Sequence, residues 1–240
     1  MTHKLLYLTL FLAFITTTKS VNACPDWYAQ IIDAKPAAWD WELNPQGIAV
    51  VDDPLGVKGK MTKFTITAKS TWPNGHTRVE LKHQGCNTDE GETTYIAWEF
   101  FLEKPFNSLN DIAYWESDGS YKQTMGFSIA PGGMHNLNKN IIRFFSRLPD
   151  RRVHWQYPIK IGAWHQLAMA VRWSESVEQG EVSVWFDKKK VVDRVKVQTK
   201  ADHNTLFIQL GLHRDQAEIP EDSIYISNVH EGRNIEDLLN

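Results

Sequence analysis

The chain has 240 residues, of which 42% are hydrophobic and 12% aromatic, and its formal net charge at pH 7 is -3. This length suits one β-rich domain with a substantial core. A charge so close to zero gives no reason to expect a nucleic-acid partner, and no apolar run is long enough to span a membrane.

The first residues have the layout of a secretory signal peptide. A short basic start precedes the apolar run Leu5–Ile15, and polar residues follow up to Ala23. We therefore expect residues 1–23 to be a signal peptide and residues 24–240 to be a single domain, secreted or periplasmic and monomeric. Val-Asn-Ala-Cys also resembles a bacterial lipoprotein box, so lipid anchoring at Cys24 is the less favoured alternative.

The chain contains two cysteines, Cys24 and Cys86. In an oxidising compartment an even pair usually forms a disulfide, and we predict one here. If Cys24 were acylated, Cys86 would be left as a thiol. Spacings typical of zinc sites are absent from the sequence, so no transition metal is expected.

After a loop-like segment at Pro25–Pro45, the chain reads as a series of short strands. Apolar alternation and turn signals place them at Gly47–Asp52, Lys60–Lys69, His76–His83, Thr93–Leu102, Tyr121–Ile129, Asn140–Leu148, Trp164–Trp173, Glu181–Lys188, Val191–Val197, Thr205–His213 and Ile224–Val229. We interpret Pro105–Asp118 as a connection and the basic stretch before Ile159 as a loop. A sustained helical period is missing, so the pattern predicts an all-β sandwich or jelly roll.

The strand His76–His83 carries an unusual row of charges. Alternation puts Val79 and Leu81 toward a core and places four ionisable side chains on the opposite face, namely His76, Arg78, Glu80 and Lys82. Such a row suggests the wall of a polar cleft. The alternative is a solvated face with a weak surface ion ladder.

A second charge feature points to an anionic ligand. Between Ser120 and Arg172 there are eight basic residues and one acidic residue, Asp150. A single basic flank on a mildly acidic protein can concentrate an anionic ligand locally. Chance clustering of solvated lysine and arginine is the competing interpretation.

Three segments resemble polysaccharide lyases of the heparin-lyase-like and glucuronan-lyase-like group, which is cognate to the alginate lyases. WHQLAMAVRWSESVEQGEVSVWFDKKKVV, beginning at Trp164, is similar to a hairpin signature of that group. FIQLGLHRDQ at Phe207–Gln216 and RVEL at Arg78–Leu81 are similar to two further segments, in the same order. The resemblance implies a concanavalin-like β-jelly roll made of two antiparallel sheets.

It also implies a secreted lyase that cleaves an acidic, uronate-containing polysaccharide by β-elimination. By position, Arg78 and Gln123 would neutralise the sugar carboxylate, and His213 would serve as base or acid. Two positions depart from the group's pattern. His213 stands where the group has tyrosine, and Met125 stands where it has histidine. His135 or His76 could replace the missing histidine, and Tyr121 and Tyr157 are the nearest phenols.

The predicted groove takes further residues from the same strands. Substrate contacts are expected from His76, Lys82, Tyr121, His135, Arg143, Arg147, Gln209 and Arg214. Aromatic stacking is expected from Trp115, Tyr121 and Phe207, and Gly211 would let a sugar ring approach the backbone.

Other properties stay open. A non-catalytic, lectin-like module that binds anionic glycans is the main alternative. A glycoside hydrolase is less favoured because the sequence shows no clear carboxylate pair. No cofactor is expected to be required. Some members of the group hold a structural calcium ion, for which the loops at Asp52–Asp53 and Asp89–Glu92 are candidates. The sequence does not identify the polysaccharide, the linkage or the endo or exo mode.

Overall fold

The computed structural model describes residues 26–86, 88–132, 139–215, 220–232 and 234–239. The predicted signal peptide, Cys24 and His135 lie outside these ranges, so the cleavage site and the Cys24–Cys86 disulfide stay predictions. Within the described ranges, no helix combines the length and the apolar character needed to cross a membrane.

Two antiparallel sheets make up most of the described chain. The first has eight strands, which are β1 (Trp27–Tyr28), β5 (Ile48–Asp52), β6 (Lys60–Ile66), β8 (Thr93–Phe101), β13 (Trp164–Arg172), β14 (Glu181–Phe186), β15 (Lys189–Lys196) and β17 (Asp222–Gly232). The second has seven, which are β4 (Trp41–Leu43), β7 (Thr77–Gln84), β9 (Asn110–Ser117), β10 (Gln123–Pro131), β11 (Asn140–Ser146), β12 (Arg152–Ile159) and β16 (Leu206–Arg214). Beside them lie the hairpin of β2 (Gln30–Ile32) and β3 (Lys35–Ala37), a 3-10 turn at Pro45–Gly47 and the short helix α1 (Ile235–Leu239).

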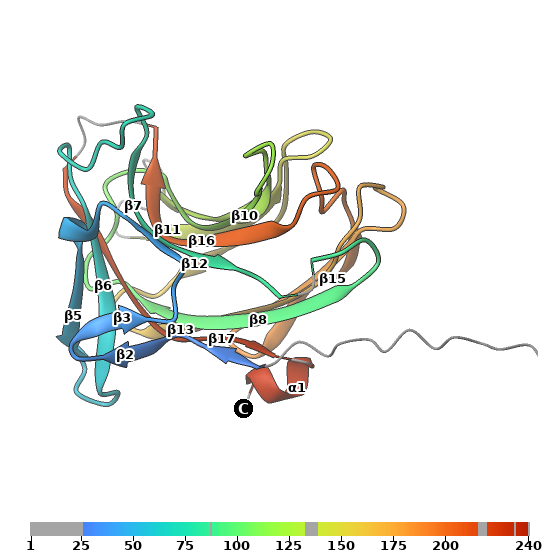
Figure 1. The fold of residues 1–240 in the computed structure, drawn as a ribbon. Helices are drawn as coiled ribbons and strands as arrows, with labels where there is room; N and C mark the ends of the chain where they lie inside the picture. The colour runs from blue at the N-terminus through green and yellow to red at the C-terminus, as the bar shows by residue number, and fades with distance from the viewer. Residues whose placement is uncertain (1–25, 87, 133–138, 216–219, 233, 240) are drawn as a thin grey trace, which may run out of the picture.

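The two sheets face each other and bend in the same sense, which confirms the predicted jelly roll (Figure 1). The seven-stranded sheet, ordered β12-β11-β10-β9-β16-β7-β4, forms the inner layer of the bend and is called the concave sheet below. The hairpin predicted from the Trp164 signature is present as β13 paired with β14.

The core between the sheets follows the predicted alternation. In β16 the core takes every second residue, Leu206, Ile208, Leu210 and Leu212. In β7 it takes Val79 and Leu81. The intervening side chains of both strands therefore point to the concave face, as the sequence predicted for the charged row of β7.

Besides the short strands of the amino-terminal segment, the sequence analysis missed two long strands of the concave sheet. The predicted connection at Pro105–Asp118 contains β9, a fully buried strand in the middle of the concave sheet. Its polar ends, Asn110–Asp111 and Glu116–Ser117, hide the alternation. The predicted loop before Ile159 contains β12, an edge strand whose Pro158 fits that place because proline cannot donate to a further neighbour.

The amino-terminal segment, predicted as loop, touches both layers. β1 pairs with β17 of the eight-stranded sheet, and β4 pairs with β7 of the concave sheet. Between these two contacts the Trp27 ring stacks on His83, with ring centroids 3.6 Å apart. The side chain of His83 also lies between the carboxylates of Asp40 and Glu231, at 3.5 and 3.4 Å.

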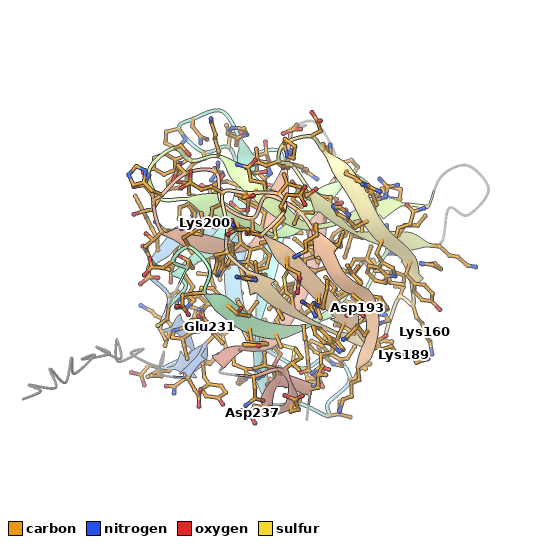
Figure 2. The ribbon with its side chains drawn as sticks, turned by 90° about the vertical axis from the view of Figure 1, so that its right-hand side faces the viewer. Lys160, Lys189, Asp193, Lys200, Glu231 and Asp237 are labelled. Atoms are coloured by element: carbon orange, nitrogen blue, oxygen red, sulfur yellow. The ribbon has the colours of Figure 1, made fainter. Side chains whose placement is uncertain are left out.

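The outer edge of the eight-stranded sheet is protected by charge. Strand β15 exposes Lys189 and Asp193, which are labelled in Figure 2, and its Arg194 and Lys196 pair with Glu181 of β14. Charged side chains on an edge strand discourage pairing with another chain.

Gly211 has a structural role that differs from the predicted one. Its φ is +147°, and a Cβ at this position would collide with the carbonyl oxygen of Val79 and lie 2.9 Å from the Cα of Glu80. The glycine is therefore needed for the close approach of β7 to β16. This role replaces the predicted one, in which Gly211 would let a sugar ring approach the backbone.

We expect Gly211→Ala to destabilise the protein by about 2 kcal/mol, since both the backbone conformation and the contact with β7 oppose a side chain. The melting temperature should fall by roughly 4–8 °C in a thermal unfolding scan. Gly59→Ala is the matched control because open space surrounds that position. An unchanged melting temperature for Gly211→Ala would contradict the assignment.

Candidate active site

The concave face carries a polar row that crosses five strands. Arg78 of β7 is paired with His213 of β16, and His213 with Asp111 of β9. Asp111 in turn is paired with Ser128 of β10, and Ser128 with Arg143 of β11. Antiparallel pairing directs such partners to the same face, so the row is a direct consequence of strand order.

A buried hydrogen-bond network lies beside this row and is centred on Gln209. Its Oε1 accepts hydrogen bonds from Arg78 Nη1 at 3.3 Å and from Tyr114 Oη at 2.9 Å. Its Nε2 donates to Glu116 Oε2 at 2.9 Å. Arg78 Nη1 also lies 3.6 Å from Glu80 Oε2. All five side chains are less than a tenth exposed.

Burial shifts the acids of this network toward their neutral forms. It raises the pKa of Glu80 to about 7, although His213 and Arg78 partly offset the effect. Burial also raises the pKa of Glu116, against the influence of Arg78 and of a hydrogen bond from Gln123. The pKa of Tyr114 lies well above its usual value because of burial and the neighbouring Glu80 and Glu116. Because both pKa values are raised, Glu80 and Glu116 are not both fully ionised when they lie beside the Arg78 cation.

Two imidazoles meet at the end of the polar row. His213 Nε2 lies 3.3 Å from Nδ1 of His76, which precedes β7. On the other side, His213 Nδ1 lies 3.9 Å from Asp111 Oδ2, and Arg147 Nη2 donates to the same oxygen at 2.8 Å. His213 is buried and His76 is exposed.

The two imidazoles have opposite tendencies to hold a proton. Burial, His213 and Arg78 lower the pKa of His76. Burial also acts to lower the pKa of His213, but the nearby carboxylates of Asp111 and Glu80 outweigh it and raise that pKa. The arrangement thus provides a proton donor next to a proton acceptor.

A pocket of about 300 Å³ opens beside these groups. It is lined by Trp41, Leu43, Trp72, Asn74, His76, Arg78, Lys82, Glu116, Tyr121, Phe207 and Gln209. Trp41 is 59% and Tyr121 68% exposed, so the side chains of both are largely accessible to solvent. A smaller pocket lies on the other side of His213 and includes Arg147 and Arg151. We call the two pockets together the groove.

The sequence matches the family model described as "Polysaccharide lyase" over residues 26–230. The chain belongs to the polysaccharide lyase family.

Solved structures show the same fold at low identity. An endo-β-1,4-glucuronan lyase from the fungus Trichoderma reesei matches with a TM-score of 0.66 and 19% identity, over 88% of this chain and 97% of that one. Family 7 alginate lyase A1-II′ matches with a TM-score of 0.56 and 12% identity, over 78% and 81%. A glycoside hydrolase family 131 domain from Coprinopsis cinerea matches with a TM-score of 0.55 and 15% identity, over 82% of each chain. No curated protein matches the sequence.

Most residues predicted to line the groove of the lyase do so. His76, Arg78, Lys82, Tyr121 and Gln209 all border the larger pocket. Lys82 Nζ pairs with Asp118 at 3.0 Å and lies 3.9 Å from the centre of the Phe207 ring.

The other predicted contacts lie along the polar row. Arg147 and His213 border the smaller pocket. Arg143 is half-buried and is paired with Ser128.

Gln123 takes a different place from the one predicted. It is paired with Glu116, and Glu116 with Phe207, six residues from His213 on β16. At roughly 3.3 Å per residue this row lies about 20 Å along the strand from His213. Gln209, and not Gln123, is the amide beside Arg78. Gln123 joins the network only through its hydrogen bond to Glu116.

Met125 does not occupy a groove position. A β-bulge between Gln123 and Met125 shifts the register with β9, so Met125 is paired with Trp115 and both are buried in the core. The expected stacking role of Trp115 is therefore wrong, and the sequence alternation across Gln123, Met125 and Phe127 fails at the bulge.

Two further predictions need correction. Arg214 borders the smaller pocket, but its Nη1 lies 3.4 Å from Asp222 Oδ2 and donates to the carbonyl oxygen of Pro220. The guanidinium of Arg214 is buried and serves this internal contact, so the predicted contact of Arg214 with substrate is not supported. Tyr157 packs on Trp155 and Phe186 at the sheet edge and is not a groove phenol. His135 lies outside the described residues.

The loops considered for calcium are held by their own donors. The carboxylate of Asp53 accepts hydrogen bonds from the N–H groups of Leu55, Val57 and Lys58 and from the Trp164 indole. Glu90 accepts from the hydroxyl of Ser174 and the N–H of Glu175. Asp53 and Glu90 thus already accept hydrogen bonds from the chain, and a structural calcium ion in either loop stays a prediction.

Sequence reasoning missed several residues of the site, among them Tyr114 and Glu116 of the buried network, Trp41, Trp72 and Asp111. Trp41 and Trp72 come from segments interpreted as loop and turn, and Asp111 lies in the predicted connection. Asp111 in particular gives no signal in the sequence, because its role depends on β9 lying between β10 and β16.

The raised pKa of Glu80 predicts a dependence of stability on pH. A carboxyl group that binds its proton more tightly in the folded state stabilises that state below its unfolded pKa of 4.5 and loses this contribution as the pH rises to about 7. For Glu80 the loss amounts to about 3 kcal/mol. We expect Glu80→Gln to flatten the decline in the free energy of unfolding over this range, measured by urea denaturation.

Glu181→Gln is the control. Arg194 and Lys196 lower the pKa of Glu181, so its contribution changes only at lower pH and with the opposite sign. Equal slopes in the wild type and Glu80→Gln between pH 4.5 and 7 would show that Glu80 does not titrate there.

Proposed function

We propose that this lyase is secreted and cleaves a uronate-containing polysaccharide by β-elimination in the groove of the concave sheet. The observation that carries the proposal is the position of Arg78 beside two imidazoles, His213 and His76, whose ring nitrogens lie 3.3 Å apart. The two similar lyases described above are named for glucuronan and alginate, and both names denote uronate polymers.

Arg78 would neutralise the substrate carboxylate. Its Nη1 is held by Gln209, while its buried Nε has no hydrogen-bond partner among the described residues. A guanidinium that is bound through one nitrogen still has N–H groups that can donate hydrogen bonds to a carboxylate. Neutralising that carboxylate makes the C5 proton of the sugar more acidic.

His76 and His213 would divide the proton transfers. His76, with its lowered pKa and exposed ring, accepts the proton from C5 as the C4=C5 double bond forms and the bond between C4 and O4 breaks. His213, with its raised pKa, donates a proton to the departing O4. Transfer of the C5 proton from His76 to His213 across 3.3 Å then restores both imidazoles for the next cycle.

The rim of the groove would hold the rest of the sugar chain. Trp41, Trp72 and Tyr121 offer ring faces for stacking against sugar rings. Lys82 near one end, and Arg147 and Arg151 near the other, supply positive charge for further carboxylates.

The test is an assay of the purified chain against glucuronan, alginate, heparin-type, hyaluronan and pectin polymers, followed by the ultraviolet absorbance of the unsaturated uronate product. We expect one polymer of this panel to yield product. Absence of product with all five, in a folded protein, would overturn the proposal. Retention on an acidic polymer without product would indicate a protein that only binds.

On the active polymer, we expect His213→Ala to lower kcat by about 10²–10⁴-fold while binding of the polymer in low salt is largely retained, because the proton donor is lost and the cations stay. His230→Ala, on the eight-stranded sheet, is the control and should leave kcat unchanged. A His213→Ala variant with wild-type kcat would remove His213 from the mechanism.

A further inference from the structure

We propose that His76, His213 and Asp215 capture one divalent first-row transition-metal ion, such as Zn²⁺, and that the captured ion switches the lyase off. The binding half of this inference stands on geometry alone. The inhibitory half rests on the proposed function.

The three side chains come from two places in the chain and converge at one end of the groove. His76 precedes β7, His213 is near the end of β16 and Asp215 follows that strand. Each offers one ligand atom, and these atoms all lie within 4.8 Å of one another. Two imidazoles and one carboxylate form a ligand set suited to zinc, copper, nickel or iron, whereas calcium and magnesium prefer oxygen ligands.

The separation of the two imidazole nitrogens fits a shared ion. His76 Nδ1 and His213 Nε2 are 3.3 Å apart. Two nitrogens bound to one tetrahedral zinc ion at about 2.1 Å would be about 3.4 Å apart. The two nitrogens are therefore already at the separation that a shared ion requires, and the exposed Asp215 can close the third position.

A carboxylate outside the three ligands supports the arrangement. Asp111 Oδ2 lies 3.9 Å from His213 Nδ1, the nitrogen opposite the one that would bind metal, and Arg147 fixes Asp111 at 2.8 Å. Metal-binding histidines commonly donate their second N–H to such a carboxylate, which sets the ring orientation and increases the basicity of the ligating nitrogen.

The surrounding charges limit the strength of binding. Asp111 and Asp215 attract a cation, while Arg78 and Arg147 repel it. We therefore expect binding weaker than at a closed structural zinc site, and readily reversed by a chelator.

Metal binding and catalysis would exclude each other. A ring nitrogen that holds a metal ion has no lone pair with which to accept a proton and no proton to donate. His76 Nδ1 and His213 Nε2 are the atoms between which the proton passes to restore the two imidazoles, so one bound ion would block the catalytic cycle.

The binding test is a calorimetric titration of the chelator-treated, full-length protein with ZnCl₂, with MgCl₂ and CaCl₂ as parallel titrants. We expect one Zn²⁺ ion per chain, no comparable signal from the other two, loss of binding in His76→Ala, and affinity lower by about tenfold or more in Asp215→Asn. His230→Ala should bind as the wild type does. Circular dichroism confirms folding of each variant. No Zn²⁺ binding, or binding undiminished in folded His76→Ala and Asp215→Asn, would overturn the site.

The activity test uses the polymer found above. We expect Zn²⁺ to inhibit the wild type, a chelator to restore activity fully, and Asp215→Asn to require about tenfold more Zn²⁺ for half-inhibition of its own metal-free activity. Full activity with the ion bound would overturn the inhibitory half. If no polymer is cleaved, the proposed function fails while the titration still decides the metal site.

Discussion

The burial of a charged network on the concave sheet is the constraint on which the rest of the site depends. Arg78, Glu80 and Glu116 lie where water has little access, and charges in such a place are costly unless they are paired. Gln209 meets this requirement from the centre, since its amide accepts from Arg78 and Tyr114 and donates to Glu116. The network fixes the guanidinium in one position, and with it the place where an acidic sugar would be held.

The fold was predicted well where alternation is clean and less well where polar function breaks it. β7 and β16 show alternate leucine and valine residues, so both their core and groove faces could be assigned from the sequence. β9 was missed because Asp111 and Glu116, which belong to the groove, stand where a regular strand pattern would be expected. The β-bulge after Gln123 has no signature in the sequence, and it moves Met125 from the groove to the core.

The sequence analysis identified individual residues of the site more successfully than it predicted which of them lie next to each other. Arg78 and His213 were identified as candidates, but their pairing depends on β7 and β16 being neighbours in the sheet, which the sequence does not specify. His76 gained its importance only through its 3.3 Å contact with His213. Likewise, His76, His213 and Asp215 have no spacing typical of a metal motif, because the turn before β7 and the end of β16 bring them together only in the folded chain.

The amino-terminal segment links specificity to architecture. The same stretch that joins the two layers through β1 and β4, and that stacks Trp27 on His83, also supplies Trp41 to the rim of the groove. A substitution in this stretch that changes the rim of the groove therefore also affects the contacts that join the two sheets. Tyr121, which lines the same pocket, lies outside this stretch and follows the turn between β9 and β10, so divergence toward new polymers is less constrained there.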